Sequence, residues 1–399
     1  MANMRIPKSL WSWAFYDFAN SAYVLIYSSF LLPVFFSTVL LSQGYSLHSW
    51  GFANGISTVM GVLLSIVVGR HADVHSRYRA FTWSIIASFA GMIAVSVSVQ
   101  YIPAYLFTAY IIANSVFILS LSLSDSILPY VADRAASYDF SGFAWGFGYL
   151  GGIASLLIVI PLQRLTGEYS FAVFSSVAVF YAIFSAYALR GLRTVPLNEK
   201  PKPQAPSLLT PKEKIILLFG YWLISECVTV ILLFYSIFLS QELGLSNGAI
   251  GILLLIVQLI AFPATWYGGV LAKGSLSLTM LGLTILCWGL AIALLVLHTG
   301  WFGLAGITIL GGLAVGNSQS ILRAQYATLI DRSESGYQFG MYAIISEGAV
   351  FIGPILYAYA SEYLHSQKIP LIALFFLMVL GYLIIVRLMK RKGTTVWCP

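Results

Sequence analysis

The chain alternates long apolar runs with short charged segments. A helix that crosses a lipid bilayer needs about 20 mainly apolar residues. Nine runs reach this length, and three of them are long enough to cross twice, with turn signals near Gly44, Pro103 and Gly300. The pattern therefore predicts 12 transmembrane helices. The runs hold at most one acidic or basic side chain each and extend over residues 9–69, 80–124, 140–163, 169–189, 215–241, 243–272, 274–322, 335–361 and 369–386.

Composition agrees with this pattern and sets the class of protein. Hydrophobic residues make up 59% of the chain and charged residues 9%, and the mean hydropathy is +0.87. A soluble fold built from this sequence would lack the polar surface needed to face water. We therefore expect an all-α integral membrane protein.

The distribution of cations predicts how the chain is oriented. If the amino terminus is cytoplasmic, only Arg164 and Lys368 of the 21 Lys and Arg residues fall on the far side. Short loops rich in Lys and Arg stay in the cytoplasm, so we expect both termini there and the cell membrane as the location. The net charge of +7 would then face the anionic headgroups of membrane lipids.

The same distribution excludes other classes of partner and site. No basic segment outside the apolar runs is long enough to form a nucleic-acid-binding module. The three cysteines and five histidines are scattered without the spacing of metal ligands. The sequence therefore predicts no cofactor, no metal site and no nucleic-acid partner.

One segment interrupts the apolar pattern. Residues 191–213 read GLRTVPLNEKPKPQAPSLLTPKE, and a stretch so rich in proline and charge predicts an extended cytoplasmic linker. It separates six predicted helices in residues 1–190 from six in residues 214–399. We expect these two parts to form an amino-terminal and a carboxy-terminal six-helix bundle.

Weak internal repeats indicate that the two parts arose by duplication. The Gly-x-x-Ala of residues 69–72 recurs at 269–272, an offset of 200, and SGFAWG at 141–146 resembles SGYQFG at 335–340, an offset of 194. Two parallel six-helix halves joined by a cytoplasmic linker are the arrangement of major facilitator transporters. The sequence therefore predicts the major facilitator fold.

A carboxylate lies within the first apolar run. Asp17 is the only charge of that run, and Asn20 and Ser21 follow three and four positions later, on the same face of a helix. Charged groups inside membrane spans usually face protein or water and mark a transport path. We expect these three residues to line such a path; the alternative is a protonated carboxyl group hydrogen-bonded to a neighbouring helix. Three tyrosines of the same run could line the same cavity: Tyr16, Tyr23 and Tyr27.

A second motif follows the second predicted helix. Gly69 and Asp73 are followed by Arg77 and Arg79, which resembles the signature of the major facilitator superfamily. Gly69 permits close helix approach, and Asp73 can accept hydrogen bonds from a helix amino terminus or pair with arginines. We expect a cytoplasmic gate here. For the two arginines, a solvated loop that only sets the orientation is the alternative.

Several strings resemble the autophagy-related vacuole effluxer family of the major facilitator superfamily. The most specific are YDFANS at residues 16–21 and SGFAWGFGYLGG at 141–152. GNSQSILR at 316–323 and FGMYA at 339–343 add support. The resemblance implies solute efflux or uptake, with amino acids as the best-known cargo of its eukaryotic members.

The remaining charges inside the apolar runs depart from that family in part. Family members tend to have an aspartate in place of Glu226, a basic residue in place of Glu347 and a neutral polar residue in place of Asp125. In the repeat register, Asp125 takes the position that Arg323 has in the other half. We therefore expect a salt bridge between these two, either as a gate or as a structural pair.

These observations predict a secondary active transporter. Carboxyl groups in surroundings of low dielectric constant exchange protons near working pH, so we expect proton coupling and a small polar solute as cargo, an amino acid or related metabolite. The protein would work as a monomer by alternating access. The path would be lined by Asp17, Asn20, Ser21, Glu226, Gln319, Arg323 and Glu347.

Three alternatives remain open from the sequence. A membrane-embedded enzyme acting on lipid would need a nucleophile or metal ligands on cytoplasmic loops. A facilitative transporter or flippase would work without ion coupling. A scaffold or receptor that transports nothing would have no need for acidic groups inside both halves.

Overall fold

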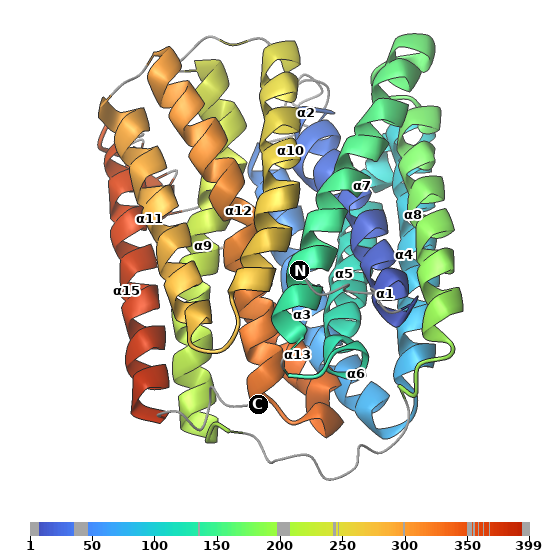
Figure 1. Cartoon of the computed structure of the whole chain (residues 1–399). Coiled ribbons are helices and arrows are strands. Elements are labelled where there is room, and N and C mark those ends of the chain that lie inside the picture. The colour runs from blue at the N-terminus through green and yellow to red at the C-terminus, as the bar shows by residue number, and fades with distance from the viewer. Residues whose placement is uncertain are drawn as a thin grey trace. The chain divides into compact units, whose positions relative to one another are not determined.

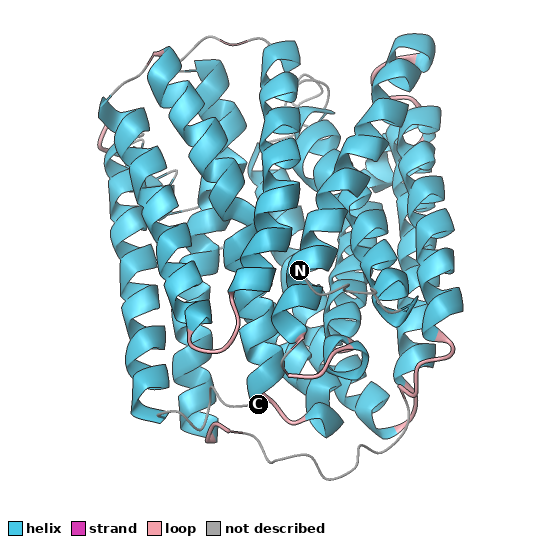
Figure 2. Cartoon of the chain, viewed as in Figure 1, coloured by secondary structure: helices cyan, strands magenta, loops and turns pink. Residues whose placement is uncertain are grey.

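Long helices joined by short loops make up the described part of the computed structural model, with no strand among those residues (Figure 2). The structure describes residues 8–35, 47–134, 136–197, 208–241, 245, 247–297, 300–348, 353, 356–357, 359–361, 363–366 and 368–392.

Contacts between backbone atoms divide the chain into two compact units. Unit 1 comprises residues 1–131, 147–202 and 332–347, and unit 2 comprises residues 132–146, 203–331 and 348–399. The units therefore differ from the two halves of the sequence in two places. Residues 132–146 of the first half belong to unit 2, and residues 332–347 of the second half belong to unit 1. The division into bundles of residues 1–190 and 214–399 stays a prediction.

Unit 1 is built mainly from the first half of the chain (Figure 1). Helix α3 packs against α5 and α13, α4 packs against α5 and α8, and α1 packs against α8. The elements are α1 (Lys8–Ala22), the π-helical η1 (Tyr23–Leu31), α2 (Leu32–Phe35), α3 (Leu47–Val74), α4 (Arg77–Tyr101), η4 (Pro103–Tyr105), α5 (Leu106–Asp125), α6 (Leu128–Val131), α7 (Ser137–Thr166) from Phe147 onward, α8 (Phe171–Leu192), η5 (Arg332–Glu334) and α13 (Ser335–Ser346).

Unit 2 contains the first turns of α7 and most of the second half of the chain. Helix α12 packs against α10 and α11, and α15 packs against α9 and α11. These elements are α9 (Pro211–Gln241), α10 (Asn247–Leu271), α11 (Leu276–Leu297), α12 (Trp301–Leu329) and α15 (Lys368–Lys392).

Local sequence explains where several helices begin. The Ser76 and Ser170 hydroxyl groups accept hydrogen bonds from the first turns of α4 and α8, as N-cap residues do. Thr210 and Glu213 form a reciprocal capping box at the start of α9. Pro103 begins η4 and Gly300 is the N-cap of α12, so two of the predicted turns are confirmed.

The predicted number of spans agrees with the structure. Ten described helices are long and apolar enough to cross a bilayer. The first predicted span is present as α1, η1 and α2 in succession, and the eleventh begins as α13. The expected turn at Gly44 and residues 198–207 of the expected linker lie outside the described residues.

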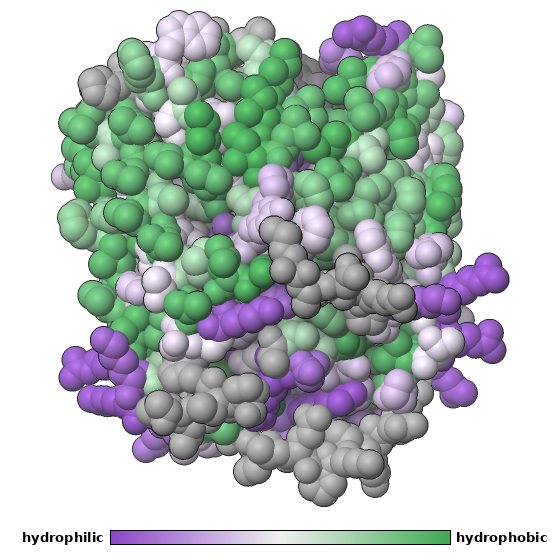
Figure 3. Space-filling view, viewed as in Figure 1, coloured by the Kyte–Doolittle hydropathy of each residue, from purple (hydrophilic) through white to green (hydrophobic). Residues whose placement is uncertain are grey.

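The surface is that of a membrane protein. Apolar side chains cover the sides of the helices on the face shown in Figure 3, whereas hydrophilic side chains gather chiefly near helix ends. Exposed leucine, isoleucine and valine side chains are common on long helices such as α3, α11 and α15. A lipid bilayer accounts for this exposure, because apolar side chains facing acyl chains need no further cover.

Candidate functional site

The polar group predicted on the first helix is present on α1. The Asn20 side-chain N–H donates to Asp17 Oδ1 at 3.3 Å, and the Ser21 hydroxyl donates to the Asp17 carbonyl oxygen at 2.8 Å. Asp17 is 7% exposed and Asn20 8%. Gly148 of α7 lies against this turn, since a Cβ atom there would be 2.8 Å from Ser21 Oγ. The absence of a side chain at Gly148 therefore lets α7 approach the carboxylate-bearing turn closely.

The tyrosines near this carboxylate lie in the packed core of unit 1. Tyr16, Tyr23 and Tyr27 are fully buried. In a membrane protein each buried hydroxyl group needs an internal partner, and helices α4, α5 and α8 supply them. The partners are the hydroxyl group of Ser120 for Tyr16, Asn114 Oδ1 at 3.1 Å for Tyr23, and the Phe174 carbonyl oxygen at 2.9 Å for Tyr27. These contacts assign the tyrosines to helix packing.

A second carboxyl group lies inside unit 2, in the middle of α9. Glu226 is 5% exposed, and neither of its oxygen atoms has a hydrogen-bond partner in the described part of the chain. Gly353 packs directly against it, and a Cβ atom there would be 2.5 Å from Glu226 Oε1. The Glu226 carboxyl group thus packs against bare glycine backbone and has no hydrogen-bond partner among the described residues.

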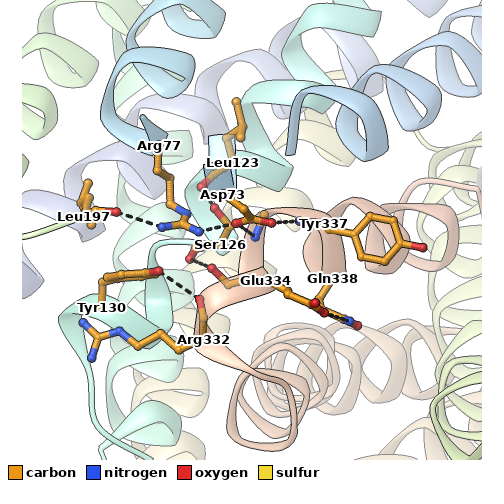
Figure 4. Close-up of polar contacts among 12 residues, drawn as sticks. Asp73, Arg77, Leu123, Ser126, Tyr130, Leu197, Arg332, Glu334, Tyr337 and Gln338 are labelled. Carbon is orange, nitrogen blue, oxygen red and sulfur yellow. Dashed lines mark hydrogen bonds and ion pairs between the residues drawn. The ribbon is translucent and has the colours of Figure 1, made fainter. Parts of the chain in front are cut away.

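Asp73 lies at the centre of a polar cluster in unit 1 (Figure 4). Its two oxygen atoms accept hydrogen bonds from the backbone N–H groups of Gly336 and Tyr337, each at 2.8 Å. Both N–H groups belong to the first turn of α13, where the helix dipole favours negative charge. Arg77 forms an ion pair with Asp73 and also donates to the Leu197 carbonyl oxygen at 2.9 Å. The expected contact of Asp73 with a helix amino terminus is therefore present.

The glycine of this motif explains how α13 comes so close. A Cβ atom on Gly69 would collide with the Gly336 carbonyl group, and one on Gly336 would collide with the Gly69 carbonyl oxygen. Both positions require glycine because the obstacle is backbone, which cannot rotate away. The two arginines differ: Arg77 is 2% exposed and paired, whereas Arg79 is exposed on the surface. The structure thus brings Arg77 into the cluster and leaves Arg79 out of it.

A tyrosine extends the cluster toward the start of α13. The Tyr130 ring lies between two guanidinium groups, with its centroid 4.4 Å from Arg77 Cζ and 4.2 Å from Arg332 Cζ. Its hydroxyl group donates to the Arg332 carbonyl oxygen at 3.0 Å. Ser335 donates to the Ser126 carbonyl oxygen at 2.9 Å. The two hydrogen bonds fix the entry to α13 on α6 and on the end of α5, and Figure 4 shows Tyr130, Ser126 and Arg332 in this cluster.

Unit 2 contains an equivalent contact that the sequence interpretation did not identify. Here Gly142 of α7 meets Gly269 of α10, and a Cβ atom on Gly142 would be 2.8 Å from Gly269 Cα. Beside them Lys273 Nζ forms an ion pair with Asp139 Oδ2 at 2.7 Å. The sequence contained a signal for this contact. Lys273 lies 200 positions after Asp73, the same offset that separates Gly69 from Gly269.

The other predicted path residues are divided between the units. In unit 2, Arg323 Nε donates to Ser141 Oγ at 2.9 Å, and its guanidinium group lies 5.5 Å from the Trp145 ring centroid. Gln319 is half-buried on the same helix, α12. In unit 1, Glu347 directly follows α13 as its C-cap residue and lies close enough to Asp125 for their charges to interact.

Asp125 and Arg323 belong to different units. The salt bridge expected between them therefore stays a prediction, as does a single path lined by residues of both units.

Comparison with known proteins gives the family. The family model described as vacuole effluxer Atg22 like matches residues 51–396, a range that excludes the YDFANS string. The chain is 23% identical over 425 residues to an uncharacterized MFS-type transporter, YxiO, of Bacillus subtilis (strain 168). That alignment covers 98% of this chain and 97% of the bacterial protein.

Solved structures give the fold. The human organic anion transporter MFSD10 (TETRAN) matches with a TM-score of 0.76 at 12% identity, covering 95% of this chain and 99% of that chain. The proton:xylose symporter XylE, bound to 6-bromo-6-deoxy-D-glucose, matches with a TM-score of 0.75 at 11% identity and 95% coverage of both chains. All three proteins are transporters, which supports a transporter over an enzyme here. The chain belongs to the vacuole effluxer Atg22-like family, and it is a multi-pass membrane transporter with the major facilitator fold.

Proposed function

We propose that this protein is a proton-coupled secondary transporter that moves a small polar solute, an amino acid or related metabolite, by alternating access. The observation that carries this proposal is Glu226, a buried carboxyl group without a hydrogen-bond partner in the described part of the chain. A charge in such a place is costly unless a counter-charge, water or a bound proton accompanies it. Glu226 therefore suits a site that is occupied in turn by a proton and by cargo.

The cargo class rests on charge complementarity and on the family. Glu226 can receive the ammonium group of an amino acid through charge-assisted hydrogen bonds. Arg323, buried in the same unit, is suited to bind a carboxylate. The described cargoes of the structural neighbours, an organic anion and a sugar, differ from each other and do not select among solutes for this chain.

The Asp73 cluster supplies the gate in this proposal. Helices α3 and α13 come from different halves of the sequence, and Asp73, Gly69 and Gly336 hold them together within unit 1. Separation of α3 from α13 would require Asp73 to leave two backbone N–H groups and open that end of the path. In this proposal the protein works as a monomer in the cell membrane. The gate lies on the cytoplasmic side, where both termini also lie.

A transport assay tests the proposal. Purified protein is reconstituted into liposomes, and uptake of labelled amino acids is measured with and without a proton gradient. We expect the gradient to drive accumulation by the wild-type protein and to have no effect on Glu226→Gln, because the glutamine side chain cannot exchange a proton. The matched control is Ser225→Ala, since Ser225 is equally buried on the same helix and its hydroxyl group also has no partner among the described residues.

Each outcome of the assay decides a part of the proposal. Uptake by the wild-type protein that ignores the gradient would contradict coupling and indicate a facilitative transporter. Gradient-driven uptake that survives in Glu226→Gln would remove Glu226 from the proton path. Asp17→Asn serves as a second arm, and unchanged flux in that variant would exclude Asp17 from the mechanism.

A further inference from the structure

The carboxy-terminal end of α15 presents a stripe of side chains with mixed chemistry. A shallow, open surface on this helix is lined by Leu383, Val386, Arg387, Lys390 and Arg391. These positions follow one another by three or four residues or are adjacent, so they occupy one helix face. The stripe begins with apolar side chains and ends with three cations.

This face of α15 points away from the rest of the protein. Leu383 is 55% exposed, and all three cations of the stripe are exposed. On the other face, Ile385 and Met389 are fully buried against unit 2. The stripe therefore faces the medium around the helix, and because α15 is long and apolar enough to cross a bilayer, we expect lipid at Leu383 and the membrane interface at the cations.

Among the described residues, the cations of the stripe form no ion pair. The neighbouring Lys392 forms an ion pair with Glu213 of α9 at 2.7 Å, which fastens the end of α15 to unit 2. No described carboxylate forms an ion pair with Arg387, Lys390 or Arg391. Three exposed positive charges beside an apolar surface therefore remain open to an anionic ligand.

The length and the chemistry of the stripe fit an anionic lipid. From Leu383 to Arg391 the helix rises by about 12 Å, enough to pass from the hydrocarbon region into the layer of headgroups. Arginine matches the oxygen atoms of a phosphate in a bidentate manner. An acyl chain on Leu383 and Val386 would place a phosphate group among the cations.

We propose that this stripe is a binding site for one anionic phospholipid, with its acyl chain on the apolar part and its phosphate group on Arg387, Lys390 and Arg391. Basic pockets at the membrane interface select anionic lipids because each cation adds to the attraction. The site is independent of the transport path, since it lies on the outer face of α15.

Lipid binding to the full-length protein tests the site. Native mass spectrometry of purified protein would compare phosphatidylglycerol with phosphatidylcholine, and inorganic phosphate would be added as a competitor. We expect the wild-type protein to prefer phosphatidylglycerol, and Arg387→Gln/Lys390→Gln/Arg391→Gln to lose this preference by on the order of 100-fold. The matched control, Arg190→Gln/Arg193→Gln/Lys212→Gln, removes three exposed cations elsewhere and should retain the preference.

Several results would overturn the proposal. Equal loss of preference in the two triple variants would show that total charge matters and that no site exists. Equal binding of the two lipids by the wild-type protein would exclude selection of an anionic headgroup. Displacement of phosphatidylglycerol by millimolar phosphate would identify the free anion as the ligand. A circular dichroism melt of both variants confirms that each is folded.

Discussion

At the scale of residues, identical side chains in one motif have different roles because their burial differs. Arg77 and Arg79 lie two positions apart, yet only Arg77 is buried and paired with Asp73. Breaking a buried ion pair leaves an uncompensated charge, whereas an exposed cation keeps its hydration. The position of each guanidinium group, and not its chemistry, decides its contribution.

This difference gives a prediction for stability. Arg77→Gln should lower the free energy of unfolding by about 3 kcal/mol, because Asp73 and the Leu197 carbonyl oxygen each lose a donor. Arg79→Gln should leave it nearly unchanged. Thermal unfolding of both variants in detergent measures the contrast. Equal melting temperatures for the two variants would contradict the assigned role of Arg77.

At the scale of elements, glycines determine which helices come together. Gly69 and Gly336 join α3 to α13 in unit 1, and Gly142 and Gly269 join α7 to α10 in unit 2. Small residues allow backbones to touch, which replaces the hydrophobic driving force that lipid does not provide. Each pair thus forms a contact in which the two helix backbones touch directly.

Adding one methyl group at such a contact tests the geometry. Gly69→Ala should weaken the contact of α3 with α13, because its Cβ atom would collide with the Gly336 carbonyl group. Gly311→Ala is the control, since a Cβ atom on Gly311 would be 3.6 Å from the Trp288 ring, at ordinary contact distance. Accessibility of a cysteine placed at Tyr337 reports the separation of the helices.

We expect labelling of this cysteine to rise in Gly69→Ala and to stay at the parent level in Gly311→Ala. Unchanged labelling in Gly69→Ala would show that α13 tolerates displacement, and that the close glycine contact does not hold it on α3.

At the scale of the whole molecule, the two glycine contacts are related by the internal repeat. Gly69 matches Gly269 at an offset of 200, and Gly142 matches Gly336 at an offset of 194. The polar group beside each contact differs, since unit 1 uses Asp73 on a helix amino terminus whereas unit 2 uses the ion pair of Lys273 with Asp139. The two related glycine contacts are thus accompanied by different electrostatic interactions.

A charge exchange tests the ion pair of Lys273 with Asp139 in unit 2. Asp139→Lys should destabilise the protein by about 3 kcal/mol, because it places a second cation opposite Lys273 at a position where the native side chain is only 10% exposed. Adding Lys273→Asp restores opposite charges and should recover more than half of the loss. Melting temperatures of the single and double variants give the coupling. Additive losses in the double variant would contradict the ion pair.

The sequence by itself determined the helices and the class of the protein. Each span must satisfy its own backbone hydrogen bonds in lipid. The lengths of the apolar runs, and the charges, Pro103 and Gly300 that interrupt them, are therefore enough to locate the spans. The polar turn of Asp17, Asn20 and Ser21 was equally predictable, because residues three and four apart share a helix face.

Only the tertiary structure decided which partners these residues have. Asp73 is bonded to N–H groups 263 and 264 positions away, the tyrosines of the first helix pack into the core of unit 1, and Lys273 meets Asp139. Such contacts depend on how helices pack, and periodicity along the chain holds no information on which faces meet. For the same reason the sequence placed Arg77 and Arg79 together, and only the fold separated the buried one from the exposed one.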